Sequence, residues 1–124
     1  MAHVNPVGWF EIPSTDLAVS QKFYQQILQL EFTILEMPPY TMAMFPSDHG
    51  QAGCSGALVA GPEVVPSANG TMVYFQSEDC AVVIGRVAAA GGTVLMEKTS
   101  IGEHGFIGMF LDPLGNKLGV HSMQ

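Results

Sequence analysis

The chain has 124 residues, 48% of them apolar and only 12% charged, which excludes a disordered protein and favours a domain with a hydrophobic core. Eleven acidic residues against four basic ones give a formal net charge of −7, so we expect neither a nucleic-acid partner nor an anionic membrane partner. Two cysteines are too few for a disulfide framework and the N-terminus lacks a secretory pattern, so we expect a cytoplasmic protein with free thiols.

The first half of the chain predicts a strand, a helix and three further strands. Apolar alternation over residues 9–12 indicates a strand that ends before Pro13, and Asp16 is a favourable N-cap for a helix that runs to about Leu28. Three later segments have strand composition and are separated by prolines and glycines, and they are 32–36, 41–45 and 56–59.

The second half predicts the same order of elements. Residues 71–76 form the expected strand, and Asp79 caps a helix that ends at Gly91 and Gly92. Strands are expected at 93–97, 106–111 and 117–121, and the segment "DPLGN" forms the turn before the last one.

The two halves are similar to each other in sequence as well as in order. Asp16-Leu-Ala-Val matches Asp79-Cys-Ala-Val at an offset of 63, and Met44-Phe45 matches Met109-Phe110 at an offset of 65. We therefore expect one domain, 1–124, with module one at about 5–60, a linker at about 61–69 and module two at about 70–122. Each module is a βαβββ unit whose sheet has one face against its helix, and the other face must be covered by the opposite half or line a cavity.

The segments "DLAVSQKFYQQIL", "EDCAVVIGRVAAAGG" and "FLDPLGNKLGV", in this order, resemble the vicinal oxygen chelate superfamily. This superfamily includes glyoxalase I, bleomycin-resistance proteins, fosfomycin-resistance enzymes and extradiol dioxygenases, and the chain is most similar to its uncharacterised bacterial glyoxalase-like group. The resemblance implies an α+β fold in which two βαβββ modules form paired half-barrels. It also implies a small organic ligand and a homodimer.

In this superfamily, residues on four inward-facing strands hold a divalent metal, usually with His or Glu side chains. Counting from the matched motifs and the repeat puts these positions at Trp9, near Cys54, at Met72 and at Gly119. Indole, thioether and glycine offer a divalent ion no usable ligand, and one thiolate is not enough. The chain is therefore expected to lack the metal cofactor. A displaced divalent site at Glu103, His104 and His121 remains open, although their spacing does not force them together.

Strand alternation predicts the side chains that line the cavity. The expected ligand-binding residues are Trp9, Cys54, Met72, Tyr74, Gln76, Lys117 and His121. Glu11 lies on the same face as Trp9 and is the candidate catalytic base if burial raises its pKa. The alternative is that Glu11 pairs with Lys117 or accepts backbone hydrogen bonds.

Two functions remain open from the sequence. One is a metal-independent binding protein of the bleomycin-resistance type, which would hold a small organic molecule between its modules. The other is a lyase or isomerase related to lactoylglutathione lyase, which would use Glu11 as base or a displaced metal.

Overall fold

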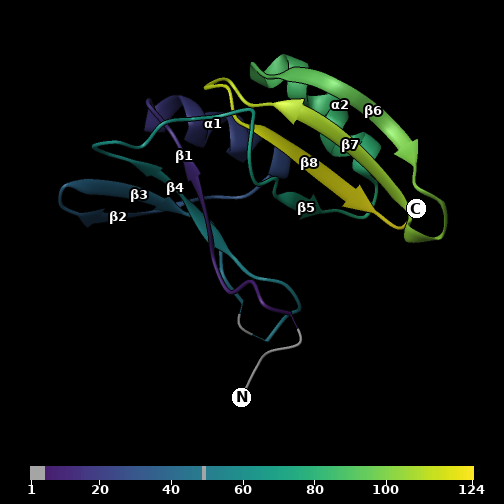
Figure 1. Ribbon diagram of the computed structural model, residues 1–124, viewed down its shortest axis with the longest axis horizontal. Helices are drawn as coiled ribbons and strands as arrows, with labels where there is room; N and C mark the ends of the chain where they lie inside the picture. Colours follow the sequence, from purple (N-terminus) through teal and green to yellow (C-terminus); the bar gives the residue numbers. More distant parts are fainter. Residues whose placement is uncertain (1–4, 49) are drawn as a thin grey trace.

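The structure is a computed structural model that describes residues 5–48 and 50–124 (Figure 1). Its elements are β1 (Phe10–Pro13), α1 (Leu17–Leu28), β2 (Thr33–Met37), β3 (Tyr40–Met44), β4 (Gly56–Ala60), β5 (Tyr74–Gln76), α2 (Cys80–Ala90), β6 (Thr93–Ser100), a 3-10 helix (Gly102–His104), β7 (Phe106–Leu111) and β8 (Lys117–Ser122). Neither described helix is long and apolar enough to cross a bilayer.

The strands form two four-stranded sheets of equivalent topology. Sheet 1 has the order β1-β4-β3-β2 and sheet 2 has the order β5-β8-β7-β6. In each sheet the first strand runs parallel to the last, and the other neighbours are antiparallel. In Figure 1 sheet 1 lies at the left and sheet 2 at the upper right, with α1 and α2 behind them. The predicted duplication of a βαβββ module in an α+β fold is therefore confirmed.

Both helices begin and end where the sequence predicts. Asp16 accepts a hydrogen bond from the backbone N–H of Val19 at 3.2 Å, and Asp79 accepts one from Ala81 at 3.0 Å. Helix α2 ends at Gly91, whose φ of 105° is readily adopted only by glycine. The ammonium of Lys98 also donates to Asp79 at 2.9 Å, and this bond is the main reason why the pKa of Asp79 lies below its usual value.

Two strand predictions differ from the structure in an informative way. Pro13 belongs to β1, because it pairs with Val59 in the parallel ladder and the following Ser14 donates to the Val59 carbonyl at 2.8 Å. Strand β5 begins at Tyr74 rather than at residue 71, so Met72 lies outside the sheet. Further upstream, linker residue Ser67 is attached to the start of β8, where its N–H donates to the Asn116 side chain and its carbonyl accepts from the Lys117 N–H.

One aromatic cluster holds the two modules together. Tyr24 of α1 is fully buried, and its ring centroid lies 6.0 Å from that of Phe45, 5.9 Å from Phe75 and 6.5 Å from Phe110. Phe10 and Phe75, from the first strand of each module, meet edge to face at 6.1 Å. The core therefore contains side chains of both sheets and is common to the two modules.

The predicted "DPLGN" turn fixes three segments to module two. The carboxylate of Asp112 accepts a hydrogen bond from the hydroxyl of Tyr24 at 2.8 Å. The side-chain amide of Asn116 donates to the Pro13 carbonyl at 2.7 Å, and its oxygen accepts from the Ser67 N–H at 3.0 Å. This turn therefore joins α1, β1 and the linker to the last two strands.

Candidate functional site

Side chains alternate between the core and the helix-free faces of the two sheets, as the sequence predicts. On β1, Ile12 is buried and Glu11 is exposed. On β5, Phe75 packs against the core while Tyr74 and Gln76 are exposed. The helix-free faces therefore present polar and aromatic side chains to solvent at the first strand of each module.

Three adjoining hollows form what we call the groove. Trp9 and Cys54 line the first, of about 310 Å³. Cys54 also lines the second, of about 290 Å³, together with Phe75 and Gln76. Gln76 in turn lines the third, of about 430 Å³, with Tyr74 and His121. Because Cys54 borders the first two hollows and Gln76 the last two, the three hollows are neighbours and extend from module one to module two.

The ring of Tyr74 covers Gly119 in the groove. The two residues are direct partners in the parallel β5–β8 ladder. A Cβ atom at position 119 would overlap the ring of Tyr74, so the ring fills the space that a side chain at 119 would take. Any metal-ligating side chain at this position would have to displace the aromatic ring.

His121 makes a short contact with the 3-10 helix that precedes β7. Its Nε2 lies 2.6 Å from the backbone oxygen of His104, which requires the proton of a neutral ring to be on Nε2 because a carbonyl can only accept. The His104 ring itself lies 3.8 Å from Glu103 at the surface. Across residues 5–48 and 50–124, no three His, Cys, Asp or Glu side chains are grouped as metal ligands. His3 and His49 lie outside the described residues.

The ladder register corrects one of the four family metal positions. Gly119 pairs with Tyr74, and the equivalent pair in module one is Ala57 with Glu11. The second position therefore falls on Ala57 of β4, whereas Cys54 lies in the preceding loop. The repeat offset of 65 matches Gly119 with Cys54, but Cys54 lies in a loop in which the two modules differ in length, so the offset does not hold there. The methyl side chain of Ala57, like glycine, has no atom that could ligate a cation.

The other two family positions, Trp9 and Met72, each lie just before the first strand of their module. Trp9 lines the groove, but Met72 lines none of the hollows named here. Indole, methyl, thioether and glycine at the four positions do not fit a divalent cation.

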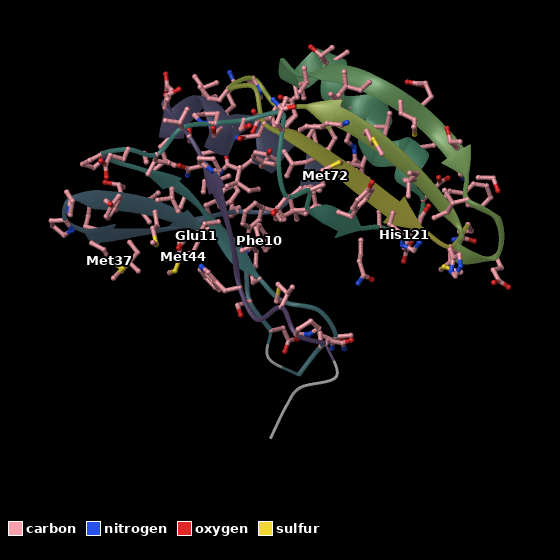
Figure 2. All side chains as sticks on the ribbon, viewed as in Figure 1. Phe10, Glu11, Met37, Met44, Met72 and His121 are labelled. Carbon is pink, nitrogen blue, oxygen red and sulfur yellow. The ribbon has the colours of Figure 1, made fainter. Side chains whose placement is uncertain are left out.

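Glu11 and Lys117 line a separate space, which we call the linker hollow. It has a volume of about 160 Å³ and lies between β1, the start of β8 and linker residues such as Asn69. Figure 2 shows Glu11 on β1 well separated from His121 at the far end of β8. Of the predicted binding residues, Lys117 therefore lines the linker hollow, Met72 lines neither space, and the others line the groove.

The expected ion pair between Glu11 and Lys117 is not formed. Among the described residues, salt-bridge contacts within 4.0 Å join Lys98 to Asp79 and His104 to Glu103. Glu11 is exposed, and its Oε2 accepts a hydrogen bond from the indole N–H of Trp9 at 3.4 Å. The carboxylate is thus oriented by Trp9 and open to solvent, whereas the sequence hypothesis for a base required it to be buried.

In the third hollow of the groove, sequence reasoning missed two apolar residues, Ile101 and Ile107. Ile107 is the direct antiparallel partner of His121. The signal was available, because the tight turn at Asp112 fixes the β7–β8 register and places residue 107 opposite residue 121. Ile101 lies in a loop and carries no periodic signal.

Comparisons with known proteins agree with this geometry. The profile of the Glyoxalase/Bleomycin resistance protein/Dioxygenase superfamily matches residues 3–120. A comparison with curated protein sequences gives no match. Similar solved structures include a glyoxylase/bleomycin resistance protein/dioxygenase domain from Frankia sp. EAN1pec, with a TM-score of 0.75 and 19% identity over 98% of this chain and 100% of that one.

Two further structures show the same fold. TnmS3, an antibiotic binding protein from Streptomyces sp. CB03234, has a TM-score of 0.73 and 20% identity over 98% of both chains. Glyoxalase I from Zea mays has a TM-score of 0.71 and 21% identity over 95% of this chain, which spans only 46% of the maize chain. At these identities the structures establish the fold, and the profile establishes the family. The chain belongs to the Glyoxalase/Bleomycin resistance protein/Dioxygenase superfamily.

Proposed function

We propose that the chain binds a small, largely aromatic organic molecule in the groove. The observation that carries this proposal is the exposure of two aromatic side chains, Trp9 at 46% and Tyr74 at 41%, at the two ends of the groove. Large aromatic side chains are normally buried, and an exposed ring beside a hollow is a stacking surface for a planar ligand. Gln76 and His121 supply the few polar groups that would orient such a ligand.

We further propose that binding does not use the superfamily's metal. Three kinds of observation support this. The residues at the family positions lack suitable donor atoms, Tyr74 fills the space beside Gly119, and His121 is engaged with a backbone carbonyl. TnmS3, an antibiotic binding protein of the same fold, adds support for binding of a small molecule.

A lyase or isomerase that uses Glu11 as base is the second candidate. It is favoured by one contact, the hydrogen bond from Trp9 to Glu11, which places the carboxylate next to a residue of the groove. The Glu11→Gln substitution separates the two functions, since it keeps volume and removes the base. An enzyme would keep its ligand and lose turnover, whereas a binding protein would keep its ligand and show no turnover in either form.

The experiment that tests binding uses the single tryptophan of the chain as reporter. Neutral and cationic polycyclic aromatic compounds are titrated against the protein while Trp9 fluorescence is followed. We expect Tyr74→Ala to weaken binding by roughly tenfold to a hundredfold, because an aromatic contact in an interface contributes about 1–3 kcal/mol. The matched control is Leu95→Ala on β6, a residue of similar exposure outside the groove. Equal loss in both variants would refute the proposal.

We also propose that two copies of the chain associate. Strand β2 forms one edge of sheet 1, and all five of its residues are exposed. Three of them are large and apolar: Ile34 is 48% exposed, Leu35 38% and Met37 52%. An unpaired apolar edge strand of this kind is normally covered by another chain.

A further inference from the structure

The linker hollow contains one acidic and one basic side chain that do not neutralise each other. Glu11 enters it from β1 and Lys117 from the first position of β8. The two are not within 4.0 Å of each other, although the hollow is only about 160 Å³ in volume. Glu11 and Lys117 therefore line one hollow without forming an ion pair.

Lys117 is unusual among the basic residues of this acidic chain. Lys98 is paired with Asp79, Arg86 donates to the Ile27 carbonyl, and Lys22 is exposed. Lys117 is half-buried, yet within the described part of the chain its ammonium has no ion-pair or hydrogen-bond partner. A bound anionic group would therefore pair with Lys117 without displacing another partner.

Glu11 can accept hydrogen bonds, whereas Lys117 can donate them. Its Oε2 accepts the hydrogen bond from Trp9 at 3.4 Å, and its Oε1 has no partner among the described residues. The carboxylate can therefore accept from a donor in the hollow. The lining also includes the apolar residues Ile12, Val73 and Leu118. The hollow thus offers an acceptor for a cation, a donor for an anion and a short apolar surface.

We propose that the linker hollow binds a small zwitterion of the amino-acid class, with its carboxylate at Lys117 and its ammonium at Glu11. A simple anion would pair with Lys117 but would be repelled by the negative charge of Glu11. A simple cation would pair with Glu11 but would be repelled by the positive charge of Lys117. A zwitterion satisfies both groups and adds no net charge to a chain that already carries −7. The volume of the hollow suits an amino acid with a short side chain.

The test titrates the purified protein with glycine, L-alanine and L-valine, and with acetate and methylammonium as single-charge controls, following backbone NMR shifts. We expect the zwitterions to bind at least about tenfold more tightly than either single ion. Lys117→Met and Glu11→Gln should each weaken alanine binding by about tenfold or more. The matched control is Lys22→Met, which removes an exposed lysine outside the hollow and should leave binding unchanged.

A charge exchange makes the test specific. In the double variant Glu11→Lys with Lys117→Glu, glycine can bind in the reverse orientation, so its affinity should return to within about tenfold of the original. Failure of the amino acids to bind, equal binding of acetate and alanine, or unchanged binding in Lys117→Met would overturn the proposal. Tyr74→Ala should leave alanine binding intact, so this inference and the proposal for the groove can fail independently.

Discussion

The hydroxyl of Tyr24 in α1 donates a hydrogen bond of 2.8 Å to Oδ2 of Asp112, 88 residues further along the chain. Both residues are buried, and Asp112 also accepts bonds from the backbone of Leu114 and from the backbone and side chain of Asn116. Burial, followed by the charge of Asp112 and this bond, raises the pKa of Tyr24 well above its usual value. A single bond thus connects the helix of module one to the turn of module two.

Tyr24→Phe should lower the free energy of unfolding by about 1.5–3 kcal/mol, the usual contribution of a hydrogen bond to a charged group. The ring stays in the aromatic cluster, and Asn116 still donates to the carboxylate, so no larger loss is expected. Urea denaturation measures the change. Tyr40→Phe is the control, because no hydrogen bond of the Tyr40 hydroxyl occurs within residues 5–48 and 50–124. A similar loss in both variants would mean that the bond to Asp112 adds no stability.

The raised pKa of Tyr24 also predicts a dependence of stability on alkaline pH. The folded state holds the phenolic proton more tightly than the unfolded chain does, so this stabilisation is complete below the unfolded pKa of about 10. It is lost as the pH rises from there towards the folded pKa. The free energy of unfolding, measured from neutral pH upwards, should therefore fall less steeply above about pH 10 in Tyr24→Phe than in the parent protein.

Divalent ions should not stabilise the protein. An ion that binds only the folded state at a concentration 100 times its Kd would add about 2.7 kcal/mol, which thermal unfolding detects easily. Zinc, nickel, manganese and iron are added in turn to protein purified without chelator, and the metal content of the same sample is determined. A stoichiometric ion at Trp9, Ala57, Met72 and Gly119 would overturn the alignment of these positions.

Gly119→Ala should change the groove more than it changes stability. The new methyl group would overlap the ring of Tyr74, which is 41% exposed and can move away. We therefore expect a loss of aromatic-ligand affinity close to that of Tyr74→Ala, with little change in the midpoint of thermal unfolding. Adding Gly119→Ala to Tyr74→Ala should cause no further loss, because the ring is already absent. An additive loss would show that the two residues act independently.

Association of two copies through β2 predicts a dimer in solution. Light scattering at tens of micromolar should give twice the chain mass, and Met37→Lys should shift the protein towards the monomer by adding charge to the apolar edge. Lysine at Thr93 of β6, an exposed position on the opposite sheet, serves as control. A monomer in the parent protein would exclude this association.

The sequence was informative wherever local chemistry decides the structure. The caps at Asp16 and Asp79, the glycine stop at Gly91 and the turn at Asp112 lie where predicted, because each depends on the conformation of a few consecutive residues. The alternation on β1 and β5 was also predictable, since a buried face imposes a period of two. The repeat then gave the common order of both sheets.

What could not be predicted depends on register and on distant partners. The placement of Tyr74 over Gly119 requires the alignment of two parallel strands that are joined by no turn. The bonds of Asn116 to Pro13 and Ser67 join segments that are 103 and 49 residues away in the sequence. Neither contact can be predicted from a pattern of consecutive residues.

The bond between Tyr24 and Asp112 has no counterpart in the other half of the duplication. The repeat offsets match Tyr24 with Val87 and Asp112 with Ser47, and a valine side chain can donate no hydrogen bond. The two halves are therefore no longer interchangeable. A chain built from two copies of the first half would have the phenol without its acceptor, and one built from two copies of the second half would have the acceptor without the phenol. The duplication is therefore asymmetric at this bond, and neither half can replace the other without losing it.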